Sequence, residues 1–193
     1  MSRAALLLLA LICAVLLAAC GEKPDKPPPI FKVKAAHGSR PTEFPDAGMI
    51  FTRPRNWTVR RREPPGVFEL VSGEAVIAGW AYPRDEPLPE TDAELEGAKN
   101  RLRSAIHDRD PNYRIERADI RELANAPAID ISGEQVLSRR TLRTRSVHIY
   151  KGDVEYVIEA IAPPGDYDAV EQGVLTPLLD SLELTGKVDE GTG

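Results

Sequence analysis

The chain has 193 residues, of which 42% are hydrophobic and 28% are charged. A chain of this length accommodates one ordinary domain with appendages but not two, and this composition is typical of a globular protein that folds without metal or disulfide support. Acidic residues outnumber basic residues by 30 to 25, which gives a formal net charge of −5. The basic excess of a nucleic-acid-binding protein is therefore missing, and we expect no nucleic-acid partner.

Residues 1–19 have the three-part pattern of a secretory signal peptide. Arg3 supplies a positive start, residues 4–19 form an uninterrupted apolar run, and this run ends in small residues. The run is shorter than the roughly 20 residues that a helix needs to cross the hydrocarbon of a bilayer. We therefore expect residues 1–19 to be cleaved off rather than kept as a transmembrane anchor.

The residues Leu17-Ala18-Ala19-Cys20 resemble the bacterial lipobox, after which a lipoprotein signal peptidase cuts once the cysteine carries a diacylglycerol. The resemblance implies that Cys20 becomes the lipid-modified N-terminus of the mature chain, held in the cell envelope on the extracytoplasmic side of a membrane. Two acyl chains suffice for stable attachment, whereas one is marginal. Cleavage also removes Cys13, so the mature chain keeps a single cysteine and cannot form an intrachain disulfide.

Residues 20–47 are predicted to be a tether, because they contain six prolines, few large apolar residues and no sustained periodicity. Extended as polyproline II at about 3.1 Å per residue, the first ten residues would hold a domain about 30 Å from the lipid. A spacer of selected length and a disordered linker both fit this composition. The globular domain is predicted to span residues 48–185, and residues 186–193 to form a disordered tail.

Four β-rich runs open the predicted domain, with turn residues between them. The fourth run carries apolar residues on both faces, which predicts a central position in the sheet. Its Trp80, like Trp57 in the second run, either lines a ligand site or anchors the core. The runs are residues 49–51, 57–59, 67–71 and 75–82.

A helix is predicted to follow, starting with a capping box formed by Thr91 and Glu94. Apolar residues from Leu95 to Ile106 recur at helical spacing. The helix must end before Asp110-Pro111, because proline disfavours helical geometry in the residue that precedes it.

Four consecutive strands come next, and the last two form the best-defined hairpin of the chain. Gly152-Asp153 suits a two-residue turn with glycine first, and this turn sets a register that pairs Ile149 with Tyr156 and Arg145 with Ala160. The strands are residues 113–123, 128–137, 142–150 and 154–162. The register places the following residues together on one face: Ser146, His148, Tyr150, Glu155 and Glu159.

A second helix is predicted after Asp166, its cap, with an apolar stripe from Tyr167 to Leu182. Pro177 lies inside this helix and predicts a kink, because its ring presses on the carbonyl four residues back. The order of elements predicts an α+β fold class, with an antiparallel β-sheet and two packed α-helices.

This order resembles the PsbP-like family, which includes PsbP, the Ran-binding Mog protein and lipoproteins of the LpqN type. The stretches "FTRPRNWTV", "YKGDVEYVIEAIAPP" and "LLDSLEL" carry the resemblance, which covers residues 48–184. It implies an α/β sandwich that acts as a non-enzymatic binding or assembly module, and the family has no shared catalytic residues to transfer.

The candidate binding residues are Arg139, Arg143 and Arg145, in the stretch "SRRTLRTRSVH". One interpretation is an anion site for a lipid headgroup, a wall phosphate or an acidic partner. The other is that Asp130 and Glu134 neutralise these arginines across neighbouring strands. The sequence leaves both open.

No catalytic residue, metal or cofactor is predicted. The three histidines lack partners at ligand spacing, and the chain contains neither a Gly-x-Ser-x-Gly elbow nor a phosphate-binding loop. Our first hypothesis is therefore a lipid-anchored module that binds an envelope protein, a lipid or a wall component without chemistry. The alternative is a cell-envelope hydrolase with an unrecognised carboxylate or serine site.

Overall fold

The computed structural model describes residues 32–188. The predicted signal peptide, Cys20 and residues 189–193 of the predicted tail lie outside this range. The strands are β1 (Arg40–Phe44), β2 (Met49–Arg53), β3 (Thr58–Arg61), β4 (Gly66–Ser72), β5 (Ala75–Pro83), β6 (Arg114–Leu123), β7 (Ala126–Leu137), β8 (Arg140–Lys151), β9 (Val154–Ala162) and β10 (Glu183–Leu184). The helices are α2 (Asp92–Arg109), α3 (Pro164–Val170) and α4 (Thr176–Asp180).

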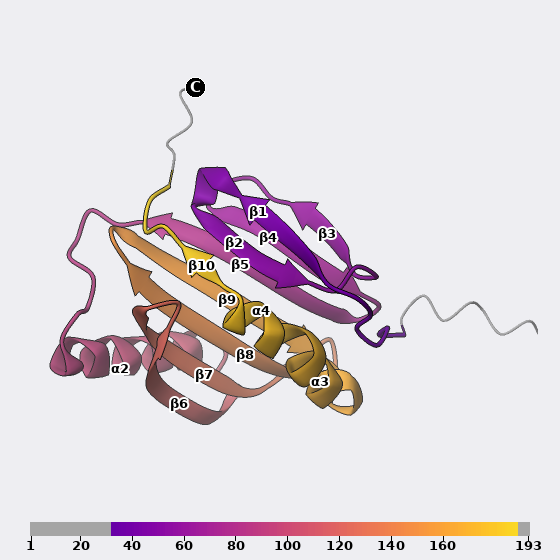
Figure 1. The fold of residues 1–193 in the computed structure, drawn as a ribbon. Coiled ribbons are helices and arrows are strands. Elements are labelled where there is room, and N and C mark those ends of the chain that lie inside the picture. Colours follow the sequence, from indigo (N-terminus) through magenta and orange to yellow (C-terminus); the bar gives the residue numbers. More distant parts are fainter. Residues whose placement is uncertain (1–31, 189–193) are drawn as a thin grey trace, which may run out of the picture. The chain divides into compact units, whose positions relative to one another are not determined.

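Seven strands form one antiparallel sheet in the order β3-β4-β5-β9-β8-β7-β6 (Figure 1). The predicted α+β class and the central position of β5 are both confirmed. The β8–β9 register is also confirmed, since Ile149 lies opposite Tyr156 and Arg145 opposite Ala160. Gly152 begins the connecting turn with φ +58°, a conformation that glycine adopts without strain.

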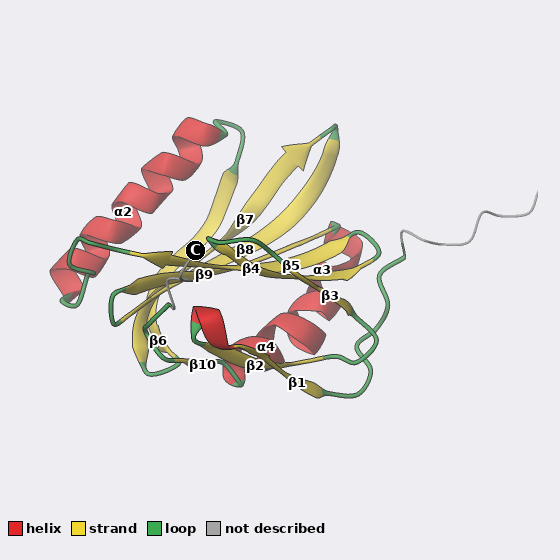
Figure 2. Cartoon of the chain, turned by 90° about the horizontal axis from the view of Figure 1, so that it is seen from above, coloured by secondary structure: helices red, strands yellow, loops and turns green. Residues whose placement is uncertain are grey.

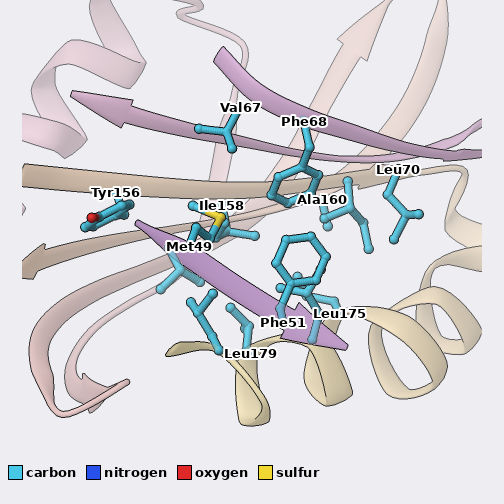
Figure 3. Packing of buried hydrophobic residues seen from close by; sticks show 14 of the residues in the cluster. Met49, Phe51, Val67, Phe68, Leu70, Tyr156, Ile158, Ala160, Leu175 and Leu179 are labelled. Carbon is cyan, nitrogen blue, oxygen red and sulfur yellow. The ribbon is translucent and has the colours of Figure 1, made fainter. Parts of the chain in front are cut away.

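One face of this sheet is buried under α3, α4 and a second, three-stranded sheet of order β1-β2-β10 (Figures 1 and 3). Phe68 of β4 and Phe51 of β2 meet between the two sheets with ring centroids 4.6 Å apart. Phe68 also lies flat on β5, where any side chain at Gly79 would collide with its ring. Leu175, which follows α3, closes this core and is fully buried.

The opposite face carries α2, which crosses only the β6–β8 side of the sheet (Figure 2). The predicted capping box is confirmed, since the Thr91 hydroxyl accepts from the Glu94 N–H and the Glu94 carboxylate accepts from the Thr91 N–H. Leu95 and Ala98 pack on Ile129 and Ile131 of β7 in a small second cluster. The rest of this face stays without a helix.

The predicted boundary of the tether at residue 47 is wrong. Residues 40–44 form β1, and Phe44 is buried. Upstream of β1, the carbonyl of Lys34 accepts a hydrogen bond from the indole of Trp57 at 3.1 Å. The prolines of this stretch made the sequence look like a tether. They are compatible with the structure because Pro41 lies in an edge strand and Pro45 in the turn after it, where no hydrogen bond of the sheet is lost.

The predicted C-terminal helix forms, but it is not α-helical throughout. A π-helical turn (Glu171–Leu175) separates α3 from α4 and directly precedes the turn that holds Pro177. The helix begins at Pro164 with Pro163 as its N-cap, so the predicted capping by Asp166 is wrong. The predicted tail also begins too early, because Gly186 is buried and Val188 packs on the core.

Candidate functional site

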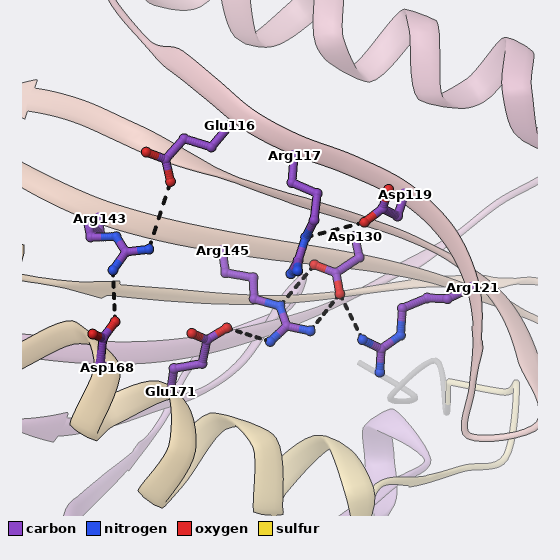
Figure 4. Close-up of polar contacts among 9 residues, drawn as sticks. All are labelled: Glu116, Arg117, Asp119, Arg121, Asp130, Arg143, Arg145, Asp168 and Glu171. Carbon is purple, nitrogen blue, oxygen red and sulfur yellow. Dashed lines mark hydrogen bonds and ion pairs between the residues drawn. The ribbon is translucent and has the colours of Figure 1, made fainter.

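The predicted arginine cluster lies on the α3 side of the large sheet. Arg145 is buried and donates to both carboxylate oxygens of Asp130, at 2.9 and 2.6 Å, and to Glu171 at 2.8 Å (Figure 4). The hydrogen bonds that Arg145 donates to Asp130 raise the pKa of Arg145, against the effect of burial. Asp130 also accepts from Arg121 at 2.9 Å. Three strands, β6, β7 and β8, and the π-helical turn that follows α3 thus meet around one ion network.

Arg143 lies on the same strand face, nearer the surface. It donates to Asp168 of α3 at 2.8 Å, and its guanidinium lies 4.4 Å from the centroid of the Tyr167 ring. Arg139 is remote from both, in the exposed β7–β8 turn, where its φ is +65°. The structure therefore joins Arg143 and Arg145 to acids of the fold itself and leaves Arg139 apart from them.

Of the two acids predicted to neutralise the arginines, Asp130 and Glu134, only one binds an arginine of the cluster. Asp130 pairs with Arg145 as the cross-strand interpretation expects, whereas Glu134 pairs with Arg114 of β6 at 2.7 Å. Because the guanidinium of Arg145 already meets two carboxylates, it has a structural role in the described chain.

A second polar group lies on the opposite face, beside α2. There the hydroxyl of Ser146 is 3.2 Å from Nε2 of His148, and Nδ1 of His148 is 2.8 Å from the carboxylate of Glu155. Ser146 and His148 are alternate residues of β8, so their side chains share a face, and Glu155 comes from the neighbouring strand β9. Serine, imidazole and carboxylate are thus linked in one hydrogen-bonded row.

The acid of this row is held ionised. Burial alone would raise the pKa of Glu155, but hydrogen bonds from His148 and Arg84 outweigh burial and hold it below the ordinary value. Arg84 reaches Glu155 from the end of β5 and donates through Nε at 3.0 Å. This arginine therefore fixes the carboxylate in place.

Glu159 stands next to the row and differs from Glu155. It lies directly opposite Ser146 in the β8–β9 register, and within residues 32–188 its side chain has no hydrogen-bond partner. Burial raises the pKa of Glu159, and the neighbouring Arg109 and His148 offset this only in part. The carboxyl is partly buried but still reaches solvent, so it can accept a hydrogen bond from a ligand.

Aromatic side chains border this face on the β5 side. Trp80 lies opposite Val157, which lies opposite His148, so the three residues form one row across the sheet. Trp80 and Tyr82 line a cavity of about 240 Å³ between β5 and the loop before β4. Trp57, by contrast, is buried and anchors the core. We name the set of Trp80, Tyr82, Ser146, His148, Glu155 and Glu159 the α2-side face.

Two geometric facts limit the chemistry of the α2-side face. The backbones of Glu155 and Glu159 are about 13 Å apart along β9, at about 3.3 Å per residue, so their carboxyl groups reach the separation of a glycosidase pair, about 5 to 9.5 Å, only if the side chains lean toward one another. Around Ser146, β8 is paired with β7 and with β9, so the backbone N–H groups that could stabilise an oxyanion are already engaged.

Metal-ligating clusters and membrane-crossing helices are both absent from residues 32–188. No group of three or more histidine, cysteine or acidic residues in this range is arranged to hold a metal ion. The described helices are also too short or too polar to cross a membrane.

No protein-family model matches the sequence, and no curated protein matches it either. The fold, however, is similar to that of cyanobacterial PsbP (CyanoP) from Synechocystis sp. PCC 6803, with a TM-score of 0.59 at 10% identity over 78% of this chain and 94% of that one. It is also similar to LpqN from Mycobacterium tuberculosis, with a TM-score of 0.53 at 13% identity over 77% of this chain and 91% of that one. These likenesses show that the fold is PsbP-like.

The sequence alone predicts part of the α2-side face. The hairpin register implied by Gly152-Asp153 places Ser146, His148, Glu155 and Glu159 on one face of the sheet. The contribution of Arg84 could not be predicted. Arg84 and Glu155 are 71 positions apart in the sequence, and only the pairing of β5 with β9 brings them together.

Proposed function

We propose that the protein is a lipid-anchored lipoprotein of the extracytoplasmic cell envelope, and that its domain is a non-catalytic binding module. The lipobox at Cys20 supports the anchor. The likeness to LpqN, which is described as involved in cell envelope biogenesis, supports the setting. The observation that carries the binding role is Glu159, a half-buried carboxyl that lacks a partner among the described residues and lies on the face that α2 covers only in part.

The α2-side face is the proposed binding surface. Trp80 and Tyr82 offer apolar ring surface, while Ser146, His148 and Glu159 offer hydrogen-bonding groups a few residues away. A surface that places aromatic rings near a few polar groups suits ligands that have both apolar and hydroxyl-bearing surfaces. A glycan of the cell wall is a ligand of this kind.

The hydrolase alternative has a specific observation in its favour, the Ser146–His148–Glu155 row. It has one against it: the backbone N–H groups around Ser146 are engaged in the sheet, so the serine lacks an oxyanion site. We therefore favour binding over hydrolysis.

Site-specific photocrosslinking in intact cells tests the proposal. A photoreactive residue in place of Val157, between Trp80 and His148, is expected to capture one reproducible envelope component. The same residue in place of Asp119, on the α3 side of β6, serves as the matched control. Equal capture at both positions would contradict a binding site on the α2-side face.

Two further variants test the remaining parts of the proposal. Cys20→Ser is expected to leave the precursor uncut and without lipid, which intact mass measures. If the unaltered chain were found mature but without lipid, the proposed lipid anchor would be wrong. Ser146→Ala is expected to change ligand capture but no turnover. If the protein hydrolysed wall material and Ser146→Ala abolished this activity, the hydrolase alternative would be correct and the binding proposal wrong.

A further inference from the structure

The tip of the β7–β8 hairpin exposes two large apolar side chains. Val136 is 57% exposed and Leu137 is 60% exposed, and the next most exposed large hydrophobic residue between residues 32 and 188 is Ile50 at 37%. Neighbouring strand residues point to opposite faces, so the exposure of both means that this end of the hairpin is uncovered on both sides. Figure 2 shows the free end of the hairpin standing clear of the helices.

The turn fixes these side chains in place. Leu137 lies opposite Arg140, and the two residues between them, Ser138 and Arg139, have φ values of +50° and +65°. Two successive positive φ values are the mark of the tight primed turns that match strand twist. Arg140 is further tied down by an ion pair with Glu74 at 2.6 Å. The apolar pair is thus held on a short, ordered projection next to two arginines.

The N-terminal segment leaves the described domain at this same end of the sheet. Glu74, which binds Arg140, lies in the β4–β5 turn, two residues after Ser72. The hydroxyl of Ser72 accepts a hydrogen bond from the N–H of Lys34 at 2.9 Å. Lys32 and Lys34 are exposed, so this end of the domain gathers basic side chains beside an apolar pair.

We propose that the hairpin tip, residues 136–140, inserts into the headgroup boundary of the anionic membrane that carries the lipid of Cys20. Apolar side chains flanked by arginine and lysine are the chemistry of membrane-surface contacts. The proposal rests on the lipid anchor proposed above. Even fully extended, the twelve steps from Cys20 to Lys32 reach only about 43 Å, which keeps the tip close to the lipid. At that effective concentration a weak contact is enough.

The tip contact would also orient the domain. The α2-side face continues along β8 from this tip, so a seated hairpin would hold the proposed binding surface beside the membrane instead of letting the domain rotate freely on its tether. An envelope ligand could then be met at a fixed height above the lipid.

Fluorescence from the tip tests this inference. In the lipidated mature protein, the Ser138→Cys variant has a single free thiol, at the hairpin tip, and Val136 and Leu137 are unchanged. This thiol is labelled with an environment-sensitive dye. In vesicles that contain phosphatidylglycerol we expect a blue shift, a severalfold rise in emission and quenching by lipids with spin-labelled acyl chains. The matched control is Ala93→Cys, an exposed position at the start of α2, where emission should stay that of water.

Two variants assign the effect to its causes. Adding Val136→Ser and Leu137→Ser should return the tip emission to its value in water, and Arg139→Glu should remove the preference for phosphatidylglycerol over neutral lipid. Emission that stays water-like in anionic vesicles overturns the inference. If the emission depends on the amount of protein on the vesicles instead of on lipid charge, the inference is also wrong, and the tip contacts a second copy of the chain or another protein.

The failure of this inference is distinguishable from a failure of the lipid anchor. Intact mass reports whether Cys20 carries lipid, independently of the dye. Lipid on Cys20 with a water-like tip defeats the hairpin contact alone. A lipid-free Cys20 defeats the anchor, and the hairpin contact with it.

Discussion

On the α3 side of the large sheet Arg145 and Asp130 are sealed in a core, whereas on the α2 side His148, Glu155 and Glu159 lie on a face that is only partly covered. Both groups occupy the same middle strands and use the same kinds of side chains. On the α3 side the opposite charges neutralise one another beneath helices and a second sheet, so their role is structural. On the α2 side one carboxyl is left without a protein partner, and this side is the one available to a ligand.

The strongest test of this contrast removes the arginine at the centre of the sealed network. Arg145→Ala leaves the buried Asp130 carboxylate with only the outer Arg121 as an ionic partner. Breaking one side of a buried pair typically costs about 3–5 kcal/mol of the free energy of unfolding. Denaturant titration measures the loss. Arg143→Ala, on the same strand face, is the matched control and should cost at most about 1 kcal/mol, because its pair with Asp168 is exposed. Equal losses would contradict a structural role specific to Arg145.

The apolar layers on the two sides should differ as well. Leu175→Ala cuts a cavity into the core between the sheets and should lower the free energy of unfolding by about 2–5 kcal/mol. Leu102→Ala removes the same atoms from α2, where the leucine is only partly buried against the smaller cluster. Thermal unfolding monitored by circular dichroism should therefore show the smaller shift for Leu102→Ala. The reverse order would mean that α2 contributes more to stability than its packing indicates.

The attachment of α2 offers a smaller test. Thr91→Ala removes the hydroxyl that accepts the Glu94 N–H and should lower the free energy of unfolding by about 1 kcal/mol. Thr91→Ser keeps the hydroxyl and is the control. If both variants unfold at the same denaturant concentration as the unaltered chain, the capping box does not help to hold α2 against the sheet.

The elements that the sequence predicted well are those decided by local rules. The β8–β9 register follows from a two-residue turn and alternation, and the limits of α2 follow from a capping box and a proline. The elements it missed depend on distant partners. β1 gains its order from the burial of Phe44 in the core between the sheets, and no local pattern in a proline-rich stretch reveals that. The same limit applies to the arginines, since only the packing of the C-terminal helical segment on the sheet brings Glu171 to Arg145.

The smallest expected effect concerns the two glutamates of the α2-side face, whose pKa values are shifted in opposite directions. The folded chain holds a proton on Glu159 more tightly than the unfolded chain does, so Glu159 makes stability fall as pH rises from about 4.3, the ordinary glutamate pKa, through its raised value. Glu155 has a lowered pKa, so its contribution is present above that ordinary value and is lost as pH falls through the lowered one.

Each glutamine variant should therefore remove one limb of the pH profile of the free energy of unfolding, measured by denaturant titration from about pH 3 to pH 7. Glu159→Gln should abolish the fall on the rising-pH side and leave the chain more stable at neutral pH than the unaltered chain. Glu155→Gln should abolish part of the loss in acid and cost stability at neutral pH, because Arg84 and His148 lose their acceptor. If Glu159→Gln gave a profile parallel to that of the unaltered chain, Glu159 would be a fully solvated carboxylate, and the α2-side face would lose the partly buried carboxyl on which its binding role depends.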